Sequence, residues 1–377
     1  MPAYLLAELT LPPGLRLARG RFRATPTALH EGAPHMSLQR YSLPSAALAA
    51  LLLASCSRAP TPVIADVDSD YDDMVSLAYL CQEHQRGNLR LAAVTVTNTG
   101  AGLPGKALRH ARCVLEACGL KDIPVADASP PTPHAFTPMM REGIDGILSD
   151  VFTRCTASAE STPKQAPQLI AEVALASPEP VTVVATGPLS NLAAALQAEP
   201  KLQEHIARTY IMGGAVSVPG NLCCGVPEEF DNTQEFNIFV DPPAAATVLR
   251  SLPAGSVSLV PLDATRHVPV TRAYAQRLAE QASASGAARV VSAIANHPNM
   301  LMGIDLGLLY WWDPLVAVAV FHPETVTFQT QSVEVVLDGA SAGRTRAAEG
   351  GQSTRVGMGA NAQRFEDLLL ESLTAQP

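Results

Sequence analysis

The sequence predicts an α/β fold with one open, mostly parallel sheet that is flanked by helices. Two observations support this prediction. Short apolar segments typical of strands alternate with longer segments of helical periodicity from residue 63 to residue 260. The strand-like segments are apolar at almost every position, as expected for parallel strands that are covered on both faces. Because such sheets bind ligands at the carboxyl ends of their strands, the residues that follow each strand are the first candidates for a site.

Strands and helices are expected in regular succession. In chain order they are a strand at 63–66, a helix at 73–85, a strand at 91–96, a helix at 104–117, an extended segment at 123–126, a helix at 166–176, a strand at 181–185, a helix at 190–197, a strand at 209–212, a helix at 241–252 and a strand at 257–260. Pro104 has a favoured first-turn position, and Asp241 is a good N-cap residue. Helices should dominate residues 271–319, a hairpin is expected near 331–345, and a last helix covers 362–374.

The composition limits the class of protein. The chain has 377 residues, of which 47% are hydrophobic and 16% are charged, which is enough for one large core or two domains. The net charge of −9 and the isoelectric point near 5.5 argue against nucleic acid as a partner, because phosphate binding needs a basic surface. No apolar run reaches the roughly 18 residues that a membrane-spanning helix needs.

A segment near the start is typical of a bacterial lipoprotein signal. Met36–Arg40 carries one positive charge, residues 45–53 form a short apolar stretch, and Leu53-Ala-Ser-Cys56 resembles a cleavage site before a lipidated cysteine. We therefore expect a signal peptide at 36–56, lipidation of Cys56, and export to the periplasm or cell surface with a lipid anchor in a bacterial membrane. A simple secretory signal and a buried helix are the alternatives.

This interpretation makes Met36 the natural start of the chain. Residues 1–35 are then expected to be a non-native or disordered N-terminal extension, and residues 57–62 a tether. Export would permit disulfides among the six cysteines that follow Cys56, but no pair has the spacing of a zinc site. Three of these cysteines are expected to pack in helices: Cys81, Cys113 and Cys118.

The strongest indication of function is a cluster of five carboxylates within eight residues, directly after the first expected strand: Asp66, Asp68, Asp70, Asp72 and Asp73. Charges of one sign repel one another strongly when they lie this close in a low-dielectric site. Such a cluster is tolerated if water solvates it or if a cation neutralises it. Ligation by oxygen alone suits a hard ion such as Ca²⁺ or Mg²⁺.

Two other carboxylate motifs fit this cluster poorly. An EF-hand loop that begins at Asp66 needs Gly at position six and Glu at position twelve, where this chain has Tyr71 and Leu77. A phosphatase of the haloacid dehalogenase type usually has Gly-Thr or Gly-Val soon after its Asp-x-Asp pair, and Ser69-Asp70 is a poor match.

The segment Asp66–Leu77 resembles the N-terminal signature of the nucleoside hydrolase family, which cleaves inosine, uridine and related N-ribosides. Later segments resemble the family's other motifs in the right order, so that the resemblance covers most of residues 63–377: 184–192, 211–221 together with 235–242, 261–265, and 312–317. The resemblance implies a single catalytic domain at 63–377 with a Rossmann-like sheet. It also implies Ca²⁺-dependent hydrolysis of the N-glycosidic bond of ribonucleosides to free base and ribose.

The resemblance further implies a metal site and a base. The ligands of Ca²⁺ would be the carboxylates of Asp68, Asp73 and Asp313 and the carbonyl of Thr186, a set that suits an ion with six to eight oxygen ligands. The metal would hold the attacking water and grip the ribose. Because Ca²⁺ acidifies water less than Zn²⁺ does, a carboxylate base is still needed, and Asp68 is the candidate for that role.

The implied ribose pocket comprises Asp72, Asn98, Asn221, Glu235 and Asn237. Carboxylates and amides bind vicinal hydroxyls and stabilise a sugar with oxocarbenium character. Each residue also has a structural alternative. Asp72 could be a helix N-cap, and Asn98 and Asn221 could satisfy local backbone groups. Glu235 and Asn237 could face one side of an extended segment.

Three further aspartates complete the acidic set. Asp66 is expected to hold the turn at the end of the first strand, and Asp263 is expected to be structural. Asp70 stands where the family often has glycine, and the resemblance gives it no role.

The chain also departs from the family pattern. The family often has Pro-Gly at Ser69-Asp70, and the segment 221–235 is longer than usual, which could reshape the base pocket. Many members have a histidine at the position of Trp312 that helps the leaving base depart. A second, more variable histidine region aligns near 141–145 and has none here.

We expect Trp311 or Trp312 to stack on the base instead, as tryptophans do in the purine-preferring branch of the family. The alternative is that both tryptophans pack in the core. Two rival functions also remain: hydrolysis of another N-riboside on the same scaffold, and a lipoprotein that binds nucleosides or sugars without turnover. Members of the family are often dimers or tetramers, but neither a homo-oligomer nor a base preference follows from the residues.

Overall fold

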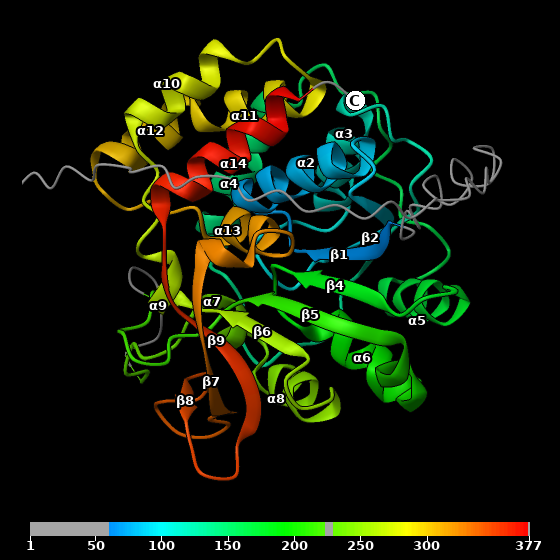
Figure 1. Ribbon diagram of the computed structural model, residues 1–377, viewed down its shortest axis with the longest axis vertical. Helices are drawn as coiled ribbons and strands as arrows, with labels where there is room; N and C mark the ends of the chain where they lie inside the picture. Colours follow the sequence, from blue (N-terminus) through cyan, green and yellow to red (C-terminus); the bar gives the residue numbers. More distant parts are fainter. Residues whose placement is uncertain (1–59, 223–228, 376–377) are drawn as a thin grey trace, which may run out of the picture. The chain divides into compact units, whose positions relative to one another are not determined.

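The computed structural model describes residues 60–222 and 229–375, and its strands form a nine-stranded sheet in the order β3-β2-β1-β4-β5-β6-β9-β7-β8 (Figure 1). Strands β1 to β6 pair in parallel. Their bounds are β1 Thr61–Val67, β2 Leu89–Thr97, β3 Val125–Ala128, β4 Val181–Ala185, β5 Ile206–Met212 and β6 Val257–Val260. The strand order therefore reverses between β1 and β4, which is the switch point where open α/β sheets bind ligands.

The remaining strands add an antiparallel part to the sheet. β9 (Gln352–Ala360) lies parallel to β6, whereas β7 (Val326–Val335) pairs antiparallel with both β9 and β8 (Thr345–Ala347). The β7–β8 pair confirms the hairpin expected near residues 331–345. The sequence did not predict β9, because Gly357, Gly359 and several polar residues weaken its strand signal.

Helices cover both faces of the sheet (Figure 1). One face carries a thick layer that consists of α2 Tyr71–Gln85, α3 Lys106–Ala117, α4 Pro138–Val151, α10 Arg272–Glu280, α11 Gly286–Ala295, α12 Pro298–Asp305, α13 Trp312–Ala319 and α14 Ala362–Thr374. The other face carries α5 Ala166–Ala176, α6 Ser190–Ala198 and α8 Pro242–Ser251. Two short helices, α7 Phe236–Val240 and α9 Leu262–Thr265, follow the strand ends of the central sheet.

Strand β1 shows how the sequence builds two cores. Val63, Ala65 and Val67 belong to the cluster that includes residues of α2, α3, α11 and α13, while Ile64 belongs to the cluster with α5, α6 and α8. Successive side chains of a strand point to opposite faces, so a continuous apolar strand is buried on both sides. The expected α/β fold, with helices on both faces of a mostly parallel sheet, is confirmed.

Most element bounds agree with the expectation from the sequence. The helix at 166–176 and the strands at 181–185 and 257–260 begin and end as expected. β1 begins at Thr61, so the last residues of the expected tether belong to the strand. Pro104 lies before α3 rather than in its first turn, because the N-cap of this helix is Gly105 with a φ of 76°.

A disulfide joins Cys113 on α3 to Cys155, which follows α4. The expectation that Cys113 only packs in a helix was therefore wrong: its side chain reaches a segment 42 residues further along the chain. Cys81, which packs in α2 as expected, and Cys118, which is the C-cap residue of α3, are buried free thiols. The expected extension at 1–35 and the expected signal at 36–56 with Cys56 lie outside the described residues.

Within residues 60–222 and 229–375, none of the helices has the length and apolar character that crossing a membrane would require.

Candidate active site

Asp66 holds the strand ends together at the switch point. Its Oδ1 accepts hydrogen bonds from Thr95 Oγ1 on β2 (2.8 Å) and from Asn191 Nδ2 on α6 (2.9 Å). Its backbone carbonyl accepts from the N–H of Thr186, directly after β4 (2.9 Å). Asp66 therefore supports the end of β1, which agrees with the role expected from the sequence.

The chain turns at Ser69, whose φ of 70° lies in the left-handed region. The residue is buried, and its hydroxyl donates to the carbonyl of Ala107 (2.9 Å). Proline, which the family often has at this position, is held at a φ of about −65° and could not adopt this conformation. The departure at Ser69 therefore accompanies a turn that a proline could not form.

Asp70 has a clear structural role as the N-cap of α2. Its carboxylate accepts from the N–H of Tyr71 (2.6 Å) and from the N–H of Asp73, while the Asp73 carboxylate accepts from the N–H of Asp70 (2.9 Å). This reciprocal pair is a capping box. The alternative that Asp72 caps the helix is therefore wrong, since Asp72 lies in the first turn.

Asp68, the expected base, lies in a space that two glycines leave open. Its side chain is buried, and its Oδ2 accepts from the N–H of Ala101 (2.8 Å). A Cβ added at Gly100 would lie 1.8 Å from Asp68 Oδ2, and a Cβ added at Gly187 would lie 2.6 Å from Asp68 Cβ. The loops that follow β2 and β4 therefore approach Asp68 so closely that only glycine fits at these positions.

Asp73 and Thr186, two of the expected metal ligands, are in contact. Asp73 Oδ1 accepts from the Thr186 hydroxyl. The Thr186 carbonyl accepts from Asn237 Nδ2 (2.8 Å), which leaves it one lone pair for a further contact. The helix α2 and the end of β4 are thus joined at the switch point.

Asp313, the remaining expected ligand, arrives from the distant helix α13. This helix packs against α2, and the N–H of Asp313 lies 3.4 Å from Asp72 Oδ2. The structure therefore brings the last sequence block to the first one, although 241 residues separate the two aspartates.

Three of these buried carboxylates, those of Asp68, Asp72 and Asp313, have a raised pKa. Burial, with the charge of Asp73 added, raises the pKa of Asp72 to about 7. Burial and the neighbouring charge of Asp73 raise the pKa of Asp68 well above its usual range. Burial raises the pKa of Asp313 in the same way, and the charges of Asp72, Asp73 and Asp68 add to the effect. Such shifts are typical of functional sites.

In the described part of the chain, no Lys, Arg or His forms an ion pair with any aspartate of this group. A divalent cation would relieve their repulsion, and an all-oxygen donor set fits a hard ion. Within residues 60–222 and 229–375, no three acid, imidazole or thiol groups already form a cluster that could hold a metal ion. The donor chemistry nevertheless fits Ca²⁺, because Asp68, Asp73, Asp313 and the Thr186 carbonyl offer only oxygen ligands.

Asn98 offers a buried acceptor without a partner. Its Nδ2 donates to Asp127 Oδ2 (2.9 Å) and Ser129 Oγ (3.0 Å), whereas its Oδ1 is buried and has no partner among the described residues. Leaving such an atom unpaired costs about 1–3 kcal/mol. A ligand hydroxyl would satisfy it, so the side chain suits a ribose contact better than the alternative of pairing with local backbone groups.

Glu235 and Asn237 do not lie on an extended segment, so that alternative was wrong. Glu235 is the N-cap of α7, and its carboxylate accepts from the backbone N–H groups of Gly214 (2.9 Å), Asn237 (3.0 Å) and Ile238 (3.2 Å). The Asn237 side chain bridges the carbonyls of Thr186 (2.8 Å) and Met212 (3.3 Å). Both residues therefore fix the strand ends around the site.

Asn221 and Asp263 also serve the backbone. Asn221 Oδ1 accepts from the N–H of Phe236 (3.1 Å), as the structural alternative for this residue predicts. Asp263 accepts from the N–H groups of Val216 and Ser217 (2.8 Å each), which agrees with its expected structural role. Part of the long segment 221–235 lies outside the described residues.

The structure separates the two tryptophans. Trp311 is buried in the core, where its ring meets the edge of Tyr274 with centroids 6.1 Å apart. It cannot stack on a base, so the core alternative is correct for this residue. Trp312 is only partly buried and lies beside Tyr310, with ring centroids 5.7 Å apart. Trp312 therefore remains available for the expected stacking role.

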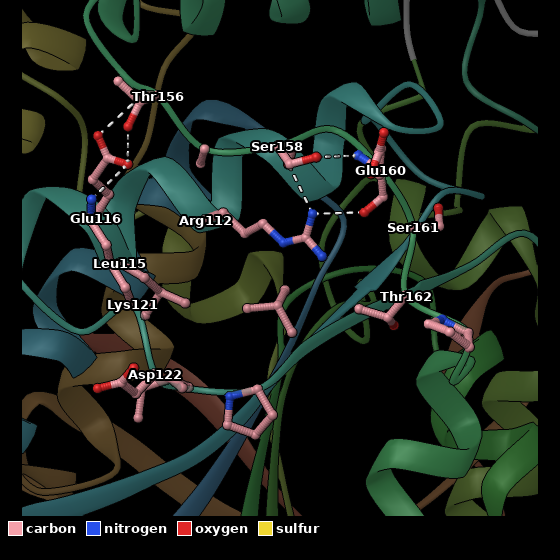
Figure 2. A pocket seen from close by; sticks show the side chains of 15 residues that line it. Arg112, Leu115, Glu116, Lys121, Asp122, Thr156, Ser158, Glu160, Ser161 and Thr162 are labelled. Atoms are coloured by element: carbon pink, nitrogen blue, oxygen red, sulfur yellow. Dashed lines mark hydrogen bonds and ion pairs between the residues drawn. The ribbon is translucent and has the colours of Figure 1, made fainter.

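A cavity of about 730 Å³ lies away from the acidic cluster, between α3 and the segment after Cys155 (Figure 2). None of the expected site residues lines it. Three of its charged side chains have partners: Arg112 donates to the carbonyls of Ser158 and Glu160, and Glu116 accepts from Thr156 and pairs with Lys121. None of the buried polar atoms that lack a partner among the described residues belongs to its lining.

The chain matches one family of known proteins in both sequence and structure. Residues 63–367 match the protein family described as inosine-uridine preferring nucleoside hydrolase. The crystal structure of an inosine-uridine preferring nucleoside hydrolase from Bacillus anthracis superposes with a TM-score of 0.71 at 26% identity, covering 83% of this chain and 99% of that one.

Curated relatives agree with this match. A pyrimidine-specific ribonucleoside hydrolase RihA from Klebsiella pneumoniae is 32% identical over 74% of this chain and 85% of its own length. A RihA from Citrobacter koseri is 36% identical, although the alignment spans only 50% of this chain and 57% of that relative. Fold, site and matches define an N-glycosyl hydrolase. The chain belongs to the inosine-uridine preferring nucleoside hydrolase family.

Proposed function

We propose that this chain hydrolyses the N-glycosidic bond of ribonucleosides to free base and ribose, with Ca²⁺ as its metal and Asp68 as its general base. The observation that carries the proposal is the set of buried aspartates at the β1–β4 switch point, with which no basic side chain of the described residues forms an ion pair. A site of this kind is built for a cation and a polar ligand rather than for stability alone.

The proposed ligands of the ion are the carboxylates of Asp68, Asp73 and Asp313 and the carbonyl of Thr186. When bound, Ca²⁺ would supply a positive charge that neutralises these groups and orients water and sugar hydroxyls. The close approach of Gly100 and Gly187 limits the positions that the Asp68 side chain can take.

The surroundings of Asp68 support proton transfer as its proposed role. The N–H of Ala101 binds one carboxylate oxygen, so the other oxygen can accept the proton of a water that attacks the anomeric carbon. As the bond to the base breaks, positive charge develops on the sugar, and nearby carboxylates stabilise it.

We assign the ribose pocket to Asp72, Asn98, Asn221, Glu235 and Asn237. Some of these residues would contact the sugar directly, and others would mainly shape the pocket. The free Oδ1 of Asn98 supports a direct contact with a hydroxyl. Glu235 and Asn221 already serve backbone donors, so their main contribution is to shape the pocket.

Trp312 is the candidate for stacking on the base. The curated relatives are named as pyrimidine-specific enzymes, which supports pyrimidine ribonucleosides as the first substrates to test beside purine ribonucleosides. We also propose export with a lipid anchor at Cys56. The disulfide between Cys113 and Cys155 supports this location, since disulfides persist in oxidising compartments.

A nucleoside panel tests the proposal. Ribose release from uridine, cytidine, inosine and adenosine is measured with Ca²⁺ and with a chelator, and the melting temperature is followed in parallel as Ca²⁺ is added. The proposal predicts metal-dependent ribose release from at least one nucleoside and stabilisation by Ca²⁺. Tight nucleoside binding without ribose release would instead favour a binding protein, and release from N-ribosides other than nucleosides would favour the other rival.

A further inference from the structure

Arg141 on α4 reaches the loop that follows β2, defined here as the 98–102 loop. Its Nη2 donates to the carbonyl of Asn98 (2.9 Å) and to the carbonyl of Gly102. One guanidinium nitrogen thus joins the two ends of this loop. Its Nε is buried and has no partner among the described residues, and both hydrogen bonds that the Arg141 head group donates go to this loop.

The 98–102 loop also contacts the proposed site directly. The N–H of Ala101 donates to Asp68 Oδ2 (2.8 Å), and the N–H of Gly102 donates to the Asp68 carbonyl (2.8 Å). Asn98 carries the free amide oxygen proposed to bind ribose. The loop therefore sets the position of the proposed base and of one proposed ribose contact.

The helix α4 is anchored in a way that directs Arg141 to this loop. Asp145, one helical turn after Arg141, accepts from Lys106 Nζ on α3 (2.5 Å) and lies 3.7 Å from His110 Nε2. Thr137 caps the start of the helix through the N–H of Met140 (3.3 Å). Residues four apart share a helix face, so the pairing of Asp145 presents Arg141 to the loop.

We propose that Arg141 is a positioning residue that closes the 98–102 loop and thereby holds Asp68 and Asn98 in the geometry that catalysis needs. The inference rests on the proposed function and deepens it, since the sequence assigns no role to this arginine. Misplacement of a catalytic group by about 1 Å can cost about 100-fold in rate.

Three variants test the proposal. Arg141→Met removes the donors but keeps an apolar stem, and Arg141→Lys keeps the charge and some donor capacity. Arg109→Met is the matched control, because Arg109 Nη2 also donates to two loop carbonyls, those of Phe152 (3.4 Å) and Cys155 (3.0 Å), beside the disulfide.

The first measurement is hydrogen–deuterium exchange of the 98–102 loop. Exchange should become faster in Arg141→Met and should stay as in the wild type in Arg109→Met. The second measurement is ribose release from the best nucleoside of the panel with Ca²⁺. We expect kcat/KM to fall about 10- to 100-fold in Arg141→Met, to recover in part in Arg141→Lys, and to stay within about threefold in Arg109→Met.

A double-mutant cycle separates positioning from general destabilisation. The losses caused by Arg141→Met and Asn98→Ala should be less than additive, because both disturb the same loop. The proposal would be overturned if Arg141→Met left the exchange of the loop or kcat/KM unchanged. It would also be overturned if Arg109→Met lost as much activity as Arg141→Met, or if the losses of Arg141→Met and Asn98→Ala were fully additive. If the wild type released no ribose from any nucleoside, the proposed function would fail, and the exchange measurement alone would decide whether Arg141 orders the loop.

Discussion

At the residue scale, the acidic cluster divides into aspartates that build the fold and aspartates left for chemistry. Asp66 joins three elements, and Asp70 caps α2. Asp68 and Asp313 have few partners and strongly raised pKa values, with burial as the main cause. The same stretch of chain therefore stabilises the start of a helix and supplies the groups that a cation would bind.

Substitution of Asp70 tests this division. Asp70→Ala removes the N-cap and should destabilise the protein by about 1 kcal/mol relative to Asp70→Asn, which keeps an acceptor for the cap. Asp70→Asn also removes a negative charge beside Asp72, so without divalent metal it should be at least as stable as the wild type. Urea unfolding with a chelator measures both differences. Equal stability of the two variants would show that the cap contributes nothing.

Trp312→Ala tests the stacking role. Stacking on an indole is worth about 0.5–1.5 kcal/mol, so kcat/KM for the preferred nucleoside should fall about 2- to 10-fold. Trp312→Phe is the control and should retain most of the activity, because it keeps an aromatic face. Small and equal losses on purine and pyrimidine nucleosides would contradict a contact with the base.

At the scale of elements, α3 connects the chain around the site. One of its faces holds the segment after α4 through the disulfide of Cys113 and through the hydrogen bonds of Arg109 and Arg112. Two further side chains of α3, Lys106 and the buried His110, contact the carboxylate of Asp145 on α4. The position of α4, and hence of Arg141, depends on the contacts of Lys106 and His110 with Asp145.

His110 should make stability depend on pH. Burial lowers its pKa to about 4, although Asp145 opposes the shift, so the folded state keeps the imidazole neutral. The unfolded chain binds the proton at an ordinary pKa near 6.5. The free energy of unfolding is therefore unaffected by the titration of His110 above about pH 6.5. As the pH falls toward 4, the unfolded chain binds a proton that the folded state does not, and the free energy of unfolding decreases by up to about 3 kcal/mol.

His110→Gln removes this titration and is the variant to compare. Urea unfolding between pH 7 and pH 4 should show that the wild type loses more stability than the variant over this interval. Parallel pH profiles of the two proteins would contradict a neutral buried His110.

At the scale of the whole molecule, the sequence predicted the sheet because parallel strands that are buried on both faces are apolar at almost every position, as at 181–185. It did not predict α4, whose interior glycines Gly143 and Gly146 lower the helix propensity. It also did not show that Cys113 pairs with Cys155, since pairing depends on how α3 and the distant segment come together.

The candidate site was predictable where its residues are close in sequence. The aspartates after β1 could be recognised from their spacing, and the family resemblance added Thr186 and Asp313. The partners Asn191 and Arg141 could not be recognised, because they are distant in sequence from Asp66 and from the 98–102 loop and only the packed sheet and helices bring them there. The caps of Glu235 and Asp70 depend on helix starts that the sequence placed differently.

The central claim is that this molecule releases ribose from nucleosides with Asp68 as the base. The most direct test is ribose release by Asp68→Asn with Ca²⁺, beside the wild type and Asp70→Asn as a control in the same acidic cluster. We predict that Asp68→Asn folds, as its circular dichroism spectrum would show, and has no measurable turnover, while Asp70→Asn remains active. Wild-type turnover by Asp68→Asn would contradict the account.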